Sequence, residues 1–325
     1  MRRREFITLL GGAAATPLSA RAQQPMRRVG VLTGLANAAA GQTRFVVFVQ
    51  AMAQLGWTEG RNVRIEARWG GGDPAVIRKQ AAELAALAPD VIMATGGATV
   101  AELLKVTRTV PIVFTVVPDP VGSGFVNSLS RPGGNATGFM QFEYSLAGKW
   151  LELLKEIAPS VTRVAILWDP SLAAGIGQFA VIQAMAPSLR VEVFPFNVHD
   201  MSEVERNVSA FASAGNGGMI VTASARTVVH GGPIATLAAQ HKLPAVYSAR
   251  DFVASGGLIS YAADFTEQVR QSAGYVDRVL KGERPADLPV QAPNKYDLVI
   301  NLKAAKALGF TMPPSVLARA DEVIE

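Results

Sequence analysis

The sequence predicts an α/β protein of two doubly wound, Rossmann-like lobes joined by crossover strands around a cleft. Short apolar strands alternate with helices at about 25–30 residues per unit, which is typical of right-handed βαβ units and a parallel sheet. The alternation starts again near Ser145 with a different sequence. The length of 325 residues also favours two domains over one.

The first half supplies the strands of the first lobe. Arg28–Leu32 is a short apolar run, and Asn62–Trp69 alternates apolar with charged side chains, as a half-buried strand near a sheet edge does. Asp90–Thr95 and Pro111–Val117 are further apolar runs that predict buried strands. After a loop at Thr33–Gln42, the expected helices are Thr43–Leu55, Pro74–Leu87 and about Ala98–Lys105.

The second half repeats this architecture. The expected strands are Arg163–Trp168, Val191–Phe196, Gly218–Ala223 and Pro244–Ser248. The expected helices are Leu146–Ile157, Ala173–Ala186, Met201–Ala214 and Pro233–His241. The tail then predicts a strand at Gly257–Tyr261, a helix at Thr266–Leu280, an extended proline-rich segment at Pro285–Pro293, and short helices at Leu302–Leu308 and Ser315–Glu322.

The predicted division of the chain has three parts. Residues 1–22 form an export signal. Residues 27–143 plus about 258–284 form lobe 1, and residues 144–257 plus about 285–325 form lobe 2. The tail supplies the crossovers between lobes, although the sequence does not show which lobe receives each piece.

The first residues are typical of a cleavable export signal. Arg2, Arg3 and Arg4 precede a short apolar run, and Ala20-Arg21-Ala22 is a pattern that signal peptidase accepts. Arg3-Arg4 with the following residues also resembles the twin-arginine export motif. No cysteine follows the cleavage site, so no lipid anchor is expected and the mature protein is expected in the periplasm.

Composition argues against several classes of protein. The chain has no cysteine, which excludes thiolate metal sites and cysteine nucleophiles, and its three histidines are too scattered to suggest a metal site. Much of the formal charge of +5 comes from the arginines of the export signal, so nucleic acid is not an expected partner. No nucleotide-binding glycine motif or nucleophile elbow is present, so an enzyme is a distant alternative and no cofactor is expected.

Many segments, in order along the whole mature chain, resemble the ABC transporter substrate-binding proteins of the tryptophan- and tyrosine-binding type. These segments are Leu55–Val63, Pro111–Phe114, Asp119–Val121, Ser128–Asn135, Leu151–Lys155, Gly256–Tyr261, Leu288–Gln291, Leu298–Lys303 and Ala320–Glu325. The resemblance implies the type I periplasmic-binding-protein fold. It also implies a non-catalytic, monomeric protein that captures a small organic solute, such as an amino acid or aromatic carboxylate, and delivers it to an ABC permease in the inner membrane.

The Thr95–Thr99 loop is the first candidate for ligand binding, because ligands of open parallel sheets bind beyond the carboxyl ends of the strands. A helix N-terminus there offers free N–H groups and a partial positive charge to a carboxylate. The candidate residues are Thr95, Gly96, Gly97, Ala98 and Thr99. An ordinary turn that needs glycine is the alternative.

Weaker candidates follow the other strands of lobe 1. Val117 and Asp119 lie in a proline-flanked loop, where the carboxylate either faces a ligand ammonium group or bonds its own backbone as a turn residue. Thr33 and Asn37 follow the first strand.

Four residues of the second lobe are expected to face the cleft from across it. Thr222, Ser224 and Ser248 lie at the ends of apolar strands, and Asp251 opens the segment after the last of them. For Asp251, capping a helix or pairing with Arg250 are alternatives to binding a ligand amine.

The main alternative to an import function is a binding protein that reports ligand occupancy to a membrane sensor.

Overall fold

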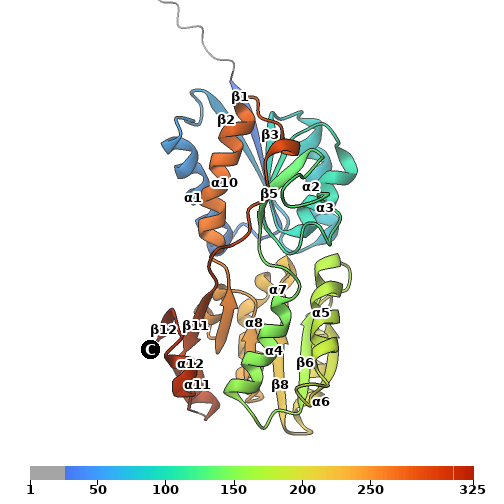
Figure 1. Cartoon of the computed structure of the whole chain (residues 1–325), viewed down its shortest axis with the longest axis vertical. Helices are drawn as coiled ribbons and strands as arrows, with labels where there is room; N and C mark the ends of the chain where they lie inside the picture. Colours follow the sequence, from blue (N-terminus) through green and yellow to red (C-terminus); the bar gives the residue numbers. More distant parts are fainter. Residues whose placement is uncertain (1–25, 310) are drawn as a thin grey trace, which may run out of the picture.

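The computed structural model describes residues 26–309 and 311–325, which form two α/β lobes stacked end to end (Figure 1). The predicted export signal, residues 1–22, lies outside the described residues. Among the residues that are described, no helix is long and apolar enough to cross a membrane.

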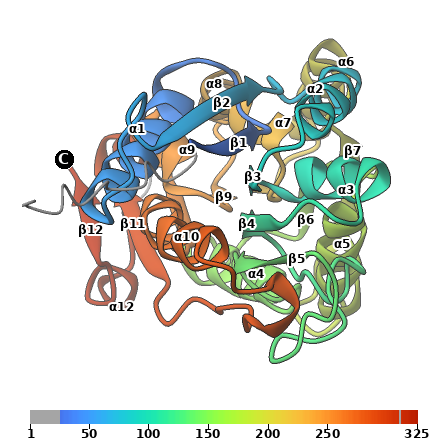
Figure 2. The same cartoon turned by 90° about the horizontal axis from the view of Figure 1, so that it is seen from above.

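The first lobe contains a parallel five-stranded sheet in the order β2-β1-β3-β4-β5. Its strands are β1 (Arg27–Thr33), β2 (Val63–Trp69), β3 (Val91–Thr95), β4 (Ile112–Val117) and β5 (Ala136–Met140). Figure 2 shows α1 (Ala39–Gln54) and α10 (Phe265–Leu280) side by side on one face, with α2 (Pro74–Ala86) and α3 (Gly97–Val106) on the other. The expected edge position of the half-buried β2 is confirmed.

The second lobe contains a seven-stranded sheet in the order β12-β11-β10-β9-β8-β6-β7, in which only the β10–β11 pair is antiparallel. Its strands are β6 (Arg163–Trp168), β7 (Glu192–Asn197), β8 (Gly217–Val221), β9 (Ala245–Tyr247), β10 (Ile259–Ala262), β11 (Asp297–Asn301) and β12 (Glu322–Ile324). Its helices are α4 (Leu146–Ile157), α5 (Ala173–Met185), α6 (Met201–Ala212), α7 (Ala225–Val229), α8 (Gly231–Gln240), α9 (Arg250–Ala254), α11 (Leu302–Leu308) and α12 (Pro314–Leu317).

Each sheet buries an apolar core on both of its faces. In the first lobe, Val29 and Val31 of β1 pack with Phe48 of α1 and with α10, while Leu32 packs on the opposite side with Leu84 of α2. This two-sided burial explains why these strands are nearly continuous apolar runs rather than alternating ones. The expectation of two doubly wound lobes is therefore confirmed.

The chain passes between the lobes more than once in the tail, and the segments divide differently from the expected boundaries. The strand expected in lobe 1 from residue 258 is β10, which pairs with β9 and β11 in the second sheet. Conversely, the segment from residue 285, expected in lobe 2, begins in lobe 1: the short 3-10 helix Pro285–Asp287 packs on β5, and Gln291 bridges Phe139. An apolar strand fits either sheet equally well, so the sequence does not show where it pairs.

Several elements were missed or misplaced from the sequence. β5 and β11 were not expected, and α1 begins at Ala39, inside the predicted loop. The predicted helix at Ser315–Glu322 is the short α12, followed by β12, which lies parallel to β11. β12 has only three residues and a half-exposed pattern, so its strand character comes from pairing rather than from periodicity.

Candidate functional site

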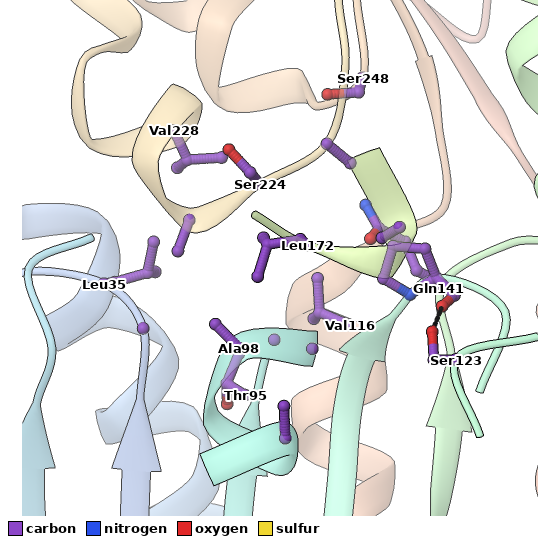
Figure 3. Close-up of a pocket in the computed structure, with 18 of the residues that line it drawn as sticks. Leu35, Thr95, Ala98, Val116, Ser123, Gln141, Leu172, Ser224, Val228 and Ser248 are labelled. Atoms are coloured by element: carbon purple, nitrogen blue, oxygen red, sulfur yellow. Dashed lines mark hydrogen bonds between the residues drawn. The ribbon is translucent and has the colours of Figure 1, made fainter. Parts of the chain in front are cut away.

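A cavity of about 220 Å³ lies between the lobes, at the carboxyl ends of strands from both sheets. In Figure 3, Leu35, Thr95, Ala98 and Val116 of the first lobe face Leu172, Ser224, Val228 and Ser248 of the second. The remaining lining is mostly small or apolar: Gly34, Gly96, Gly97, Ala101, Pro118, Phe125, Ala173, Ala174, Ala223, Ala225, Ala249 and Phe265, together with Arg44, Ser123, Gln141 and Ser171.

The wall from the first lobe is built around the start of α3. Gly96 has a φ of 94°, which favours glycine, and this conformation turns the chain from β3 directly into the helix. Thr99 is fully buried and its hydroxyl donates to the Gly96 carbonyl at 2.7 Å, which fixes the turn. The first N–H groups of α3, at Gly97 and Ala98, have no carbonyl within the helix to bond and lie at the cavity.

The wall from the second lobe contains the starts of α5, α7 and α9. Ser171, Leu172 and Ala173 lead into α5, and Ser224 caps α7 by accepting from the Thr227 amide at 3.0 Å. The fully buried Gln178 joins two of these segments, because its amide nitrogen donates to Ala174 at 2.8 Å and its oxygen accepts from the Ala223 amide at 2.8 Å.

A buried serine hydroxyl lines the cavity without a protein partner in the described chain. Ser248 is 1% exposed and its hydroxyl has no hydrogen bond. Gln141, which is 3% exposed, also lines the cavity. Because buried polar groups are usually hydrogen-bonded, the Ser248 hydroxyl indicates a site that a ligand or water completes.

The charged group in the lining is Arg44 of α1. Its guanidinium lies 2.5 Å from Asp251 of α9 in the other lobe and 5.4 Å from the ring centre of Phe265. Side-chain exposure is 10% for Arg44 and 37% for Asp251, so the arginine is the more enclosed partner. This ion pair ties the two lobes together beside the cavity.

A tyrosine supports the far end of the lining. The hydroxyl groups of Tyr144 and Ser123 are 2.9 Å apart. Burial raises the pKa of Tyr144 from its ordinary value, against the opposite effect of the hydrogen bond with Ser123. The phenol therefore stays protonated at neutral pH and adds no negative charge to this end of the site.

The structure brings some of the predicted site residues together and separates others. The predicted residues that line the cavity are Thr95, Gly96, Gly97, Ala98, Ser224 and Ser248. Those outside the lining are Thr33, Asn37, Thr99, Val117, Asp119, Thr222 and Asp251.

Most of these outlying residues have a structural contact instead. Asp119, at a φ of 36°, accepts from the Gly122 amide at 2.7 Å, which is the turn role weighed as its alternative. Thr222 donates to the Leu167 carbonyl at 2.9 Å, and the Thr33 hydroxyl accepts from the Leu35 amide at 3.2 Å.

The other four residues also have contacts outside the cavity, and Thr99 bonds the Gly96 carbonyl, as described above. Val117 is fully buried in the core of the first lobe, exposed Asn37 accepts from Gln42, and Asp251 pairs with Arg44 rather than with its neighbour Arg250.

Sequence reasoning missed Arg44, Gln141 and the start of α5. The residues after β6, Ser171 to Ala174, obey the same strand-end rule that predicted the Thr95 loop and were open to discovery by it. Arg44 sits within a helix and Gln141 in a crossover, so neither carries a local signal of ligand binding.

Comparisons with known proteins agree with this architecture. A family model described as ABC transporter substrate binding protein matches residues 30–324. The chain is 26% identical over 262 residues to a tyrosine-binding protein of Clostridioides difficile (strain R20291), across 80% of this chain and 75% of that one.

Solved structures are similar over nearly the whole described chain. A conserved domain protein from Vibrio cholerae has a TM-score of 0.85 at 28% identity, covering 92% of this chain and 99% of that one. An ABC domain from Streptococcus pneumoniae in complex with L-Trp has a TM-score of 0.83 at 27% identity, covering 92% and 100%.

The two lobes, their strand orders and these structural neighbours establish the type I periplasmic-binding-protein fold. Since the family model also spans nearly all of the described residues, the chain belongs to the ABC transporter substrate-binding protein family.

Proposed function

We propose that the protein is the periplasmic solute-capturing component of an ABC importer, delivering a small organic solute to a permease in the inner membrane. The observation that carries this proposal is the cavity whose walls come from both lobes. A solute there contacts both lobes only when they are closed, so binding favours the closed arrangement.

The size and lining of the cavity support a small molecule as the solute. Its volume of about 220 Å³ is below the range of about 300–1,000 Å³ that is usual for drug-sized ligands. The names of the relatives, a tyrosine-binding protein and an L-Trp complex, favour an amino acid or another aromatic carboxylate. The lining combines apolar side chains with a few polar groups, which suits such a solute.

Binding without chemical conversion is part of the proposal. Serines line the cavity, but among the described lining residues there is no histidine, cysteine, lysine or carboxylate, so the usual general bases that activate a hydroxyl nucleophile are missing from its wall. We also propose that the protein is exported through the signal at residues 1–22 and acts as a monomer.

The test is a thermal-shift screen of the mature protein against amino acids, aromatic acids, sugars and other small metabolites. A true solute raises the melting temperature by mass action, and small-angle scattering then shows a smaller radius of gyration for the complex. Mass spectrometry is expected to recover the solute unchanged. Chemical conversion of the solute, or no stabilising compound in the screen, would contradict the proposal. If the protein binds a solute but a strain that lacks the protein takes up that solute normally, the result points to sensing instead of import.

A further inference from the structure

The charge of the cavity wall has one sign. Arg44 is the charged residue among those of the described chain that line the cavity, and no aspartate or glutamate is among them. A zwitterionic amino acid brings a carboxylate and an ammonium group into the same enclosed space. An ammonium group that is removed from water needs an anionic or at least a well-placed acceptor partner.

Some aspartates lie close in the sequence to residues that line the cavity, but their carboxylates already have protein partners. Asp119 accepts from the Gly122 amide and lines a different hollow. Asp251 pairs with Arg44 at 2.5 Å and also lines a separate hollow, on the other side of that arginine.

Two further carboxylates also lie close in the sequence to lining residues. Asp169 accepts from both the amide and the hydroxyl of Ser171, at 3.0 and 2.5 Å, and lies 3.7 Å from Arg226. Asp264 caps α10 by accepting from its first amides, at 2.8 and 3.1 Å. Neither lines the cavity. A ligand ammonium group would therefore have to compete for any of these four aspartates with the partners that they already have.

Groups that favour an anion are present instead. The starts of α3 and α5, helices of 10 and 13 residues, reach the cavity from opposite lobes at Ala98 and Ala173. Each presents free N–H groups and the positive end of a helix dipole. The unpaired hydroxyl of Ser248 adds a hydrogen-bond donor at the same wall, where the side-chain amide of Gln141 also lies. Both residues are more than nine-tenths buried.

The rest of the wall is apolar and includes two aromatic rings. The two rings are those of Phe125 and Phe265. Leu35, Val116 and Leu172 also line the cavity and are labelled in Figure 3. Such a wall stabilises a compact hydrocarbon or aromatic body by removing its surface from water.

We infer that the solute is a small monocarboxylate with an apolar, ring-sized body and without an ammonium group. This inference rests on the proposed function. The carboxylate lies between the starts of α3 and α5, and the ring packs among the apolar residues. The missing counter-charge makes the amino acid with the same side chain the weaker ligand, because its ammonium group is desolvated without an anionic partner.

Matched pairs of compounds test this inference on the mature protein by titration calorimetry. The pairs are 3-(4-hydroxyphenyl)propionate with L-tyrosine and indole-3-propionate with L-tryptophan, which differ only in the ammonium group. The acid of a pair is expected to bind on the order of 100-fold more tightly than its amino acid, as expected for one unpaired buried charge. Tyramine and tryptamine, which keep the amine and lack the carboxylate, are expected not to bind.

A charge change at the cavity wall provides an independent test. Ala98 is half-buried at the start of α3, where an aspartate is compatible with the helix dipole and with folding. Ala98→Asp is expected to lower the affinity for 3-(4-hydroxyphenyl)propionate by roughly 100-fold and to narrow the preference over L-tyrosine. Ala98→Asn has the same shape without the charge and is expected to change that preference little.

The outcomes separate this inference from the proposed function. Equal or tighter binding of L-tyrosine or L-tryptophan than of the matched acids would overturn the inference and leave solute capture standing. If the tightest ligand of the screen is a neutral compound, the inference is likewise overturned and solute capture still stands. Failure of every compound in the metabolite screen would contradict solute capture itself.

Discussion

Ser248 and Ser260 provide a contrast at the scale of single residues. Both are almost fully buried, at 1% and 0% exposure, and neither hydroxyl has a hydrogen-bond partner in the described chain. Ser248 lines the cavity between the lobes, whereas Ser260 of β10 lies at a hollow beside it. The proposed ligand site therefore offers a partner to the Ser248 hydroxyl and not to the Ser260 hydroxyl.

Ser248→Ala is expected to weaken binding of 3-(4-hydroxyphenyl)propionate about tenfold while leaving the ligand-free melting temperature unchanged or slightly higher. The physical reason is that removing an unpaired buried hydroxyl takes away a desolvated group without breaking any protein hydrogen bond. Calorimetry gives the affinity and thermal unfolding gives the stability. Ser260→Ala is the matched control, expected to leave affinity unchanged, and equal affinities for the wild type and Ser248→Ala would refute a role in binding.

The residue scale also explains why some predicted site residues lie outside the cavity. Asp119 and Thr222 have the residue types and strand-end positions of ligand contacts, but each bonds a nearby backbone group instead. Polar side chains at strand ends also hydrogen-bond the backbone of turns. The choice between the two depends on the direction of a side chain, which the sequence does not contain.

At the scale of elements, the second-lobe wall depends on how α5 is held against the loop after β8. Gln178 makes that connection through both ends of its side-chain amide, to Ala174 and Ala223. The helix start and the loop both line the cavity, so their relative position sets its shape.

Gln178→Met is expected to destabilise the protein by about 2 kcal/mol, because a side chain of similar length leaves the Ala223 amide buried and unpaired. The melting temperature is expected to fall by roughly 4–8 °C. Affinity for 3-(4-hydroxyphenyl)propionate is expected to fall as well, since the wall is no longer fixed. Denaturant unfolding and calorimetry measure the two effects. The control is Gln240→Met, because Gln240 is exposed. Equal stability of the Gln178→Met and Gln240→Met variants would contradict the bridging role.

At the scale of the whole molecule, the two lobes meet closely beside the cavity. A Cβ atom added to Gly34 of the first lobe would lie 2.8 Å from Cβ of Ala225 at the start of α7 in the second. This position therefore needs glycine for the approach of the lobes rather than for its own backbone dihedrals.

Gly34→Ala is expected to hinder closure and to weaken binding of 3-(4-hydroxyphenyl)propionate about tenfold or more, because binding and closure are coupled. Small-angle scattering of the ligand-saturated variant is expected to give a larger radius of gyration than that of the wild type. Gly274→Ala in α10, where an added Cβ has nothing within 4 Å, is the control and is expected to leave affinity unchanged. A closed Gly34→Ala complex with full affinity would show that this contact does not limit closure.

The sequence by itself determined the alternation of strands and helices, the two lobes and the strand ends where a ligand site belongs. Periodicity and burial are local properties, so apolar runs such as those of β3 and β4 specify strands wherever they pair. The glycine turn before α3 was found in the same way, because its residue types follow from its own backbone geometry.

Only the tertiary structure decided which sheet β10 joins, that Arg44 and Asp251 meet across 207 positions of sequence, and that α5 faces α3 over one cavity. These features depend on how two lobes are placed against each other. Sequences with the same local patterns can place their lobes differently. No single stretch of the chain therefore specifies how the lobes meet.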